Sequence, residues 1–145
     1  MEFVPRACSD RLRRMLKTFP AVLVYGPRQC GKSTLIRKLL PDWHHFDLER
    51  PADLGLIGAD IEGFLHRYPR RVAIDEAQRL PEIFPALRHA IDLAPPARGR
   101  FVLTGSSSPG LLRTASESLA GRVGLLELTP FRPSELADRP AASGR

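Results

Sequence analysis

Short apolar segments recur along the chain, and each is followed by a stretch with helical spacing. The run Ala21–Tyr25 has the near-continuous hydrophobicity of a strand that is buried on both faces of a parallel sheet. Strands that alternate with helices predict β-α-β units with right-handed crossovers. We therefore expect an α/β fold, with five strands at residues 21–25, 45–48, 71–75, 100–104 and 124–128.

The segments between these strands have the apolar periodicity of amphipathic helices. In the first, apolar residues recur at i, i+3, i+4 and i+7, and Ser9 or Asp10 is the expected N-cap. Proline follows the second directly, at Pro41, and stops the helix there. Helices are expected at residues 12–19, 32–40, 61–68, 81–91 and 109–120.

Residues 26–33, GPRQCGKS, fit the phosphate-loop pattern G-x-x-x-x-G-K-[ST], the Walker A motif, between a buried strand and an amphipathic helix. Gly26 and Gly31 permit the backbone to approach a phosphate, so that N–H groups form an anion nest at the helix N-terminus. Lys32 is expected to reach the β and γ phosphates, Ser33 to ligate Mg²⁺, and Thr34 to donate to the α phosphate. The expected nucleotide-binding residues are Gly26, Pro27, Arg28, Gln29, Cys30, Gly31, Lys32, Ser33 and Thr34.

A second motif, RVAIDEAQ at residues 71–78, is an apolar strand that ends in two acids, the Walker B pattern. Asp75 is expected to hold the Mg²⁺ shell, and Glu76 to orient and activate the attacking water. An ordinary acidic boundary between a strand and a loop would look the same in isolation. The position of the pair downstream of Lys32 in an alternating chain favours the catalytic interpretation.

Two further candidates lie in the second half of the chain. Thr104, in LTGSSS, can face the γ phosphate from the end of the fourth strand, with Ser106 as the next choice, although a loop start rich in serine and glycine is nearly as good an interpretation. Arg122, in SLAGRV, could supply a guanidinium that stabilises transition-state charge. Its spacing alone fits an ordinary surface arginine better.

Composition narrows the function classes. Apolar residues make up 43% of the 145 residues and charged residues 26%, values typical of a globular domain, and no apolar run is long enough to span a bilayer. We therefore expect a cytoplasmic protein without a membrane partner. The chain contains no Asn, which excludes the NKxD motif of GTPases, and no G-x-G-x-x-G dinucleotide loop. The net charge of +6 raises nucleic acid as a partner, but the arginines are scattered along the sequence.

Taken in order, the segments GPRQCGKSTL, FDLERP, RVAIDEAQRLPEIF, FVLTGSSS, SLAGR and LELTPFRPSEL resemble the prokaryotic AAA-type ATPases whose longer members carry a C-terminal domain of unknown function. The resemblance implies a parallel sheet with the fourth strand between the strands of the two Walker motifs, so that Thr104 faces the same cleft as Lys32 and Asp75. It also implies a water-activating role for Glu76 and a role for Arg122, in its own site or in that of a neighbour.

These observations predict a three-layer P-loop NTPase of the AAA type at residues 1–138, followed by a disordered tail at residues 139–145. The expected function is Mg²⁺-dependent binding and hydrolysis of ATP, with Glu76, Lys32, Thr104 and Arg122 as catalytic residues. The alternatives are a nucleotide-binding switch with little hydrolysis and a small-molecule P-loop phosphotransferase. ATP and ADP are the expected ligands, and a homo-oligomer or a separate effector chain is the expected partner.

Overall fold

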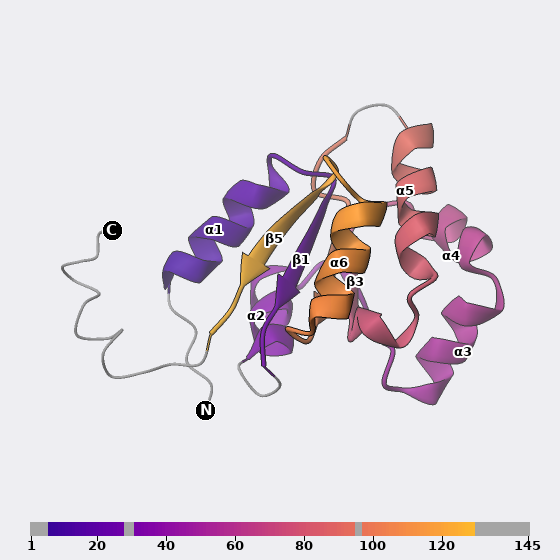
Figure 1. The fold of residues 1–145 in the computed structure, drawn as a ribbon, viewed down its shortest axis with the longest axis horizontal. Coiled ribbons are helices and arrows are strands. Elements are labelled where there is room, and N and C mark those ends of the chain that lie inside the picture. Colours follow the sequence, from indigo (N-terminus) through magenta and orange to yellow (C-terminus); the bar gives the residue numbers. More distant parts are fainter. Residues whose placement is uncertain (1–5, 28–30, 95–96, 130–145) are drawn as a thin grey trace.

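The protein folds around a five-stranded parallel sheet, with strand order β2-β3-β4-β1-β5 (Figure 1). The computed structural model describes residues 6–27, 31–94 and 97–129. As the family resemblance implies, β4 lies between β1 and β3. The strands are β1 (Ala21–Tyr25), β2 (His44–Asp47), β3 (Val72–Asp75), β4 (Phe101–Gly105) and β5 (Val123–Glu127).

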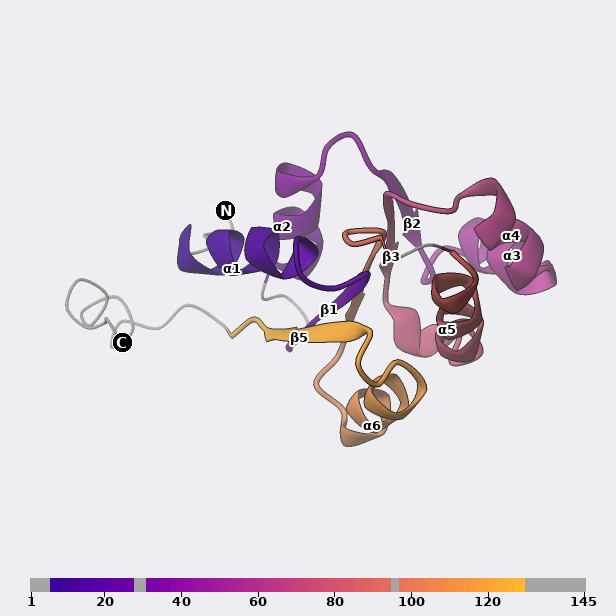
Figure 2. The same cartoon turned by 90° about the horizontal axis from the view of Figure 1, so that it is seen from above.

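Helices cover both faces of the sheet, which gives the predicted three layers (Figure 2). One face packs against α1 (Arg6–Leu16) and α2 (Lys32–Leu39) through a cluster that includes Val22 and Val102. The other face packs through Leu23 and Leu103 against the remaining helices. These are α3 (Pro51–Ala59), α4 (Ile61–Arg67), α5 (Ile83–Leu93) and α6 (Pro109–Ser118).

Three local features differ from the sequence-based expectations. Helix α1 runs through Ser9 and Asp10, so neither residue is its N-cap. Helix α3 was not expected: its two glycines and weak amphipathic pattern hide it, although Pro51 occupies its first turn, where proline is favoured. A short 3₁₀ turn, η1 (Ala77–Arg79), follows β3. The other strand and helix boundaries shift by one or two residues.

Strand alternation decides which residues face α2. Val72 and Ile74 of β3 pack on the α3–α6 side, whereas Ala73 packs on the α1–α2 side. Because successive side chains point to opposite faces of a sheet, Asp75 falls on the α2 side, as does Thr104 after Val102. Both residues lie at the carboxyl ends of their strands, which is where α2 begins after β1.

Within the described ranges, no helix has the length and apolarity needed to cross a membrane. Residues 130–145, which include the tail expected at 139–145, lie outside the described part of the chain.

Candidate functional site

The phosphate loop leaves the carboxyl end of β1 and enters α2, at the bottom of Figure 1. Gly31 caps α2 with φ 88°, a left-handed conformation that costs other residues roughly 1–2 kcal/mol. The buried Gly26 donates its N–H to the carbonyl of Gly105 over 3.2 Å, which joins the loop to β4. Of the two glycines of the motif, Gly31 thus has the left-handed backbone that favours glycine, and Gly26 joins the loop to the sheet. Arg28, Gln29 and Cys30 lie outside the described residues.

Lys32 is a buried cation with 5% of its surface exposed, held by the loop itself. Its Nζ donates to the carbonyl oxygens of Pro27, at 2.8 Å, and Gly26, at 3.1 Å. A buried ammonium is stable only when its donors are satisfied, and here main-chain oxygens of the loop satisfy two of them. The lysine is therefore fixed at the mouth of the loop.

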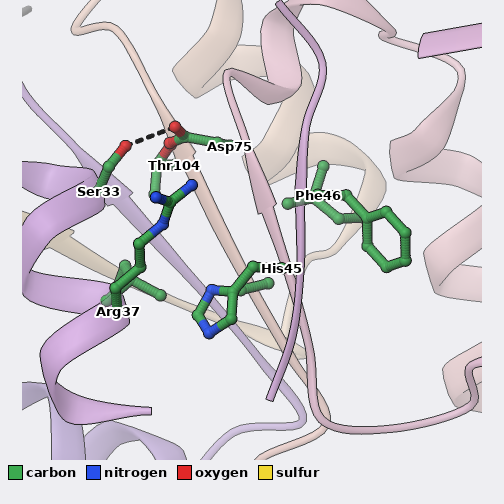
Figure 3. A pocket seen from close by; sticks show the side chains of 9 residues that line it. Ser33, Arg37, His45, Phe46, Asp75 and Thr104 are labelled. Carbon is green, nitrogen blue, oxygen red and sulfur yellow. Dashed lines mark hydrogen bonds between the residues drawn. The ribbon is translucent and has the colours of Figure 1, made fainter. Parts of the chain in front are cut away.

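Asp75 connects α2, β3 and β4 through a hydrogen-bond network (Figure 3). The Ser33 hydroxyl donates to one oxygen of its carboxylate, and the Thr104 hydroxyl donates to the other. Thr104 Oγ1 also accepts the backbone N–H of Glu76 over 3.1 Å. Ser33, Asp75 and Thr104, which are far apart in the sequence, thus form one polar cluster, and Thr104 and Asp75 lie together as the family resemblance implies.

Glu76 follows this cluster in a strained conformation. Its φ of 59° and ψ of 52° are left-handed, a region that non-glycine residues seldom occupy outside turns and functional sites. Gln78 donates from Nε2 to Glu76 Oε1 over 2.6 Å. The other amide atom, Gln78 Oε1, is buried and has no hydrogen-bond partner among the described residues. Sequence reasoning missed Gln78, whose position two residues after the acid was the available signal.

A small cavity of about 10 Å³ lies between α2 and the strand ends, lined by Ser33, Asp75 and Thr104 among others. Arg37 also lines it, with its guanidinium extended toward these polar groups (Figure 3). Arg37 is one helical turn after Ser33 and therefore shares its face of α2, a spacing the sequence reasoning did not use.

The oxygen donors of this cluster suit a magnesium ion. Mg²⁺ in nucleotide sites keeps several waters and takes one or two carboxylates or hydroxyls together with substrate phosphates. Ser33 and Asp75 offer one of each, already in contact. The described residues contain no group of three or more His, Cys, Asp or Glu residues arranged to bind a metal by themselves.

Arg122 is not brought into this cluster. Its carbonyl accepts the N–H of Ala21, the first residue of β1, whereas the phosphate loop begins beyond the last residue of that strand. At about 3.3 Å per strand residue, roughly 15 Å separates the two ends. The Arg122 guanidinium instead holds the Asp92 carboxylate through two hydrogen bonds, of 2.7 and 3.0 Å. This hydrogen-bonded pair lowers the pKa of Asp92 and raises that of Arg122.

A family model described as an AAA domain matches residues 18–137. The chain therefore belongs to the AAA domain family. Together with the parallel sheet and its helical layers, this match makes it an AAA-type P-loop ATPase domain. The family implies nucleotide binding.

Two curated relatives carry the same kind of segment. They are Uncharacterized protein Rv2008c of Mycobacterium tuberculosis and Uncharacterized protein Mb2031c of Mycobacterium bovis, each 47% identical over 127 residues. The match covers 86% of this AAA domain and 28% of each relative. The chain thus spans little more than a quarter of the length of these relatives.

Solved structures share the fold at low identity. The Walker-type ATPase PABY2304 of Pyrococcus abyssi superposes with a TM-score of 0.59 and 19% identity, over 95% of this chain and 59% of that one. A STAND protein with a tetratricopeptide repeat sensor, PH0952 of Pyrococcus horikoshii, gives a TM-score of 0.56 and 19% identity, over 99% of this chain and 26% of that one.

Proposed function

We propose that this AAA domain binds ATP with Mg²⁺ and hydrolyses it. The observation that carries the proposal is the Asp75 carboxylate, which accepts hydroxyl hydrogen bonds from Ser33 on α2 and Thr104 on β4. A metal-binding role is supported because these oxygen atoms lie next to the start of α2, where the loop would hold the phosphates, and a second carboxylate, Glu76, is next in the chain.

The binding part of the site consists of the loop and the start of α2. The helix N-terminus favours negative charge, and Lys32 adds a buried cation. We expect a phosphate group to take over the Lys32 donors now given to the loop carbonyls, and Thr34 to donate to the α phosphate. Ser33 and Asp75 would hold Mg²⁺, which neutralises phosphate charge when bound.

Glu76 is the residue that would take the proton from water. Its N–H is held by Thr104, and its carboxylate by Gln78, so both its backbone and its side chain are fixed. A base that is fixed in this way stays oriented to accept a proton from a positioned water, because its side chain does not rotate away. Thr104 would act as a positioning residue for both Asp75 and Glu76.

A second candidate, a nucleotide-dependent switch with little intrinsic hydrolysis, is favoured by one observation. Arg122, the candidate arginine finger, is bound to Asp92 at the amino ends of the strands, opposite the phosphate loop. In this conformation it cannot reach a nucleotide bound to its own chain. It could act only on a neighbouring copy. Turnover by a single chain would then lack the stabilisation that such a finger supplies, roughly 10³- to 10⁵-fold.

Phosphate release from Mg·ATP, measured beside nucleotide binding by calorimetry, tests the proposal. We expect Lys32→Ala to lose binding, and Glu76→Gln to keep binding while turnover falls about 10²- to 10⁴-fold. Glu117→Gln, an exposed glutamate on α6, is the matched control and should leave both unchanged. Unchanged turnover in Glu76→Gln would remove the proposed base, and absence of nucleotide binding in folded wild-type protein would overturn the proposal itself.

A further inference from the structure

A cluster of arginines lies at the amino ends of the strands, opposite the phosphate loop. Arg70 and Arg71 directly precede β3, and Arg98 and Arg100 precede β4. Together with Trp43 these residues line a hollow of about 690 Å³ at the amino ends of the strands. We refer to Trp43, Arg70, Arg71, Arg98 and Arg100 as the arginine groove.

The charge of this groove is not compensated within the described part of the chain. In this part of the chain, no carboxylate lines the hollow, and no ion pair joins any of its four arginines to an acid. Arg122, at the same end of the strands, does form an ion pair, with Asp92. Asp42, in the turn before β2, is the acid nearest to the groove in sequence. Burial and the neighbouring charge of Arg70 lower the pKa of Arg100. Like charges held together in this way form a ready site for an anion.

Backbone carbonyls hold two of the four arginines, Arg98 and Arg100. Arg100 has 7% of its surface exposed, and its Nε donates to the carbonyl of Pro69 over 2.9 Å. Arg98 donates from Nε to the carbonyl of Thr18 over 3.3 Å, a bond that leaves its two terminal nitrogens for other acceptors. Arg71 has φ 60°, a strained value of the kind found at binding sites. Two of the four arginines are therefore tied to backbone carbonyls, whereas the side chains of Arg70 and Arg71 are exposed at the rim of the hollow.

Ring side chains extend the groove on the β2 side. A second hollow of about 460 Å³ is lined by His44 and Tyr68 and shares residues 69–71 with the first. The His44 side chain is exposed, and its ring meets that of Tyr68 in an edge-to-face arrangement with the centroids 4.9 Å apart. Trp43 lines the first hollow beside it. Basic groups interleaved with rings are the combination that binds single-stranded nucleic acid.

We propose that the arginine groove, with His44, binds single-stranded nucleic acid, with the exposed Arg70, Arg71 and Arg98 contacting phosphodiesters and the rings stacking on bases. The site is separate from the Asp75 cluster, since the two lie at opposite ends of the strands, and it does not depend on ATP hydrolysis. Duplex DNA and acidic peptides offer negative charge without accessible base faces, so the rings distinguish them from the proposed ligand.

Fluorescence anisotropy with a labelled 20-nucleotide oligothymidylate and the 145-residue chain tests this proposal. Because each phosphate contact on a single strand contributes about 0.7 to the salt slope, three contacts predict a slope of roughly −2. Affinity should then fall about 20-fold between 50 and 200 mM salt. Substitution of Arg70→Gln together with Arg98→Gln should weaken binding at least about tenfold. His44→Ala should weaken it about fivefold or more through lost stacking.

The matched control carries Arg13→Gln and Arg113→Gln, which remove the same charge from exposed sites on α1 and α6. It should bind the oligonucleotide like the wild type, and every variant should bind Mg·ATP normally. Equal losses in the control and the groove variant would show attraction by net charge alone. Equal affinity for a duplex of the same length or for polyglutamate, or no binding of the oligonucleotide, would also overturn the proposal. Because nucleotide binding is measured separately, failure here leaves the proposed ATPase function intact.

Discussion

The amide of Gln78 donates a hydrogen bond of 2.6 Å to the carboxylate of Glu76, two residues before it. The opposite end of the amide, Gln78 Oε1, is buried without a partner among the described residues. Space beside it is closed, because a Cβ on Gly105 would lie 2.9 Å from Oε1 and would also meet Leu111. Gln78 is therefore held in one orientation, and it restricts the carboxylate proposed to activate water.

Gln78→Met removes the amide while keeping a side chain of similar length. We expect kcat for ATP hydrolysis to fall about 10- to 100-fold, because Glu76 loses its orientation, with KM changed less than about twofold. Steady-state phosphate release measures both constants. A rise in KM at unchanged kcat would instead place Gln78 in nucleotide binding.

Thr104 is 2% exposed, and Thr104→Val removes a hydroxyl that donates to Asp75 and accepts from the backbone of Glu76. The Glu76 N–H then lacks its acceptor, which should lower the free energy of unfolding by about 1–3 kcal/mol and reduce turnover. Thr104→Ser, which retains the hydroxyl, should keep most of the wild-type free energy of unfolding and most of the wild-type turnover. Urea unfolding and phosphate release check this, and equal behaviour of the two variants would argue against the network.

Gly31→Ala should weaken the phosphate loop. At φ 88° an alanine is strained, so we expect a loss of about 1–2 kcal/mol in unfolding free energy together with weaker nucleotide binding. Gly55→Ala is the control: a Cβ at Gly55 would meet nothing within 4 Å, and its helical position should make alanine neutral or stabilising by up to about 1 kcal/mol. Matching destabilisation at the two sites would contradict the role given to Gly31.

We expect Arg122 to contribute to ATP hydrolysis only in the site of a neighbouring copy of the chain. We expect turnover per chain to rise with protein concentration, and Arg122→Ala to abolish that rise without changing the rate at high dilution. Mixing Arg122→Ala with Lys32→Ala chains should restore activity, since each supplies what the other lacks. An effect of Arg122→Ala on fully monomeric protein would show action within one chain.

The Arg122–Asp92 pair also predicts a pH dependence. Hydrogen bonding to Arg122 lowers the pKa of Asp92 below its ordinary value of 3.8, so the stability it contributes is present above that pH and is lost as pH falls through the lowered value. Asp92→Asn should therefore unfold at lower urea than wild type by a constant margin at pH 5–8, and the margin should close below about pH 4. The exposure of the pair makes the margin small. A margin that grows on acidification would contradict the pairing.

Periodicity and motif spacing predicted most of the fold. The run Ala21–Tyr25 forms the strand expected of it because a continuous apolar segment between helices can be buried only inside a covered sheet. Helix α3 was missed because PADLGLIGA lacks a clear apolar stripe, and its packing beside α4 and β2 stabilises it instead. The helix propensities of the individual residues contribute too little free energy to decide whether such a segment forms a helix.

By itself, the sequence determined the order of strands and helices, the phosphate loop and the acidic pair at the end of the third strand, because each depends on residues that are neighbours in the chain. Tertiary structure decided which distant groups meet. It brings Ser33 and Thr104 to the carboxylate of Asp75, and it gathers four arginines at the amino ends of two strands. It also holds Arg122 at the end of the strands opposite the phosphate loop. These outcomes depend on strand order and on the face to which each side chain points. Both are set by the burial of apolar surface over the whole domain rather than by any local pattern.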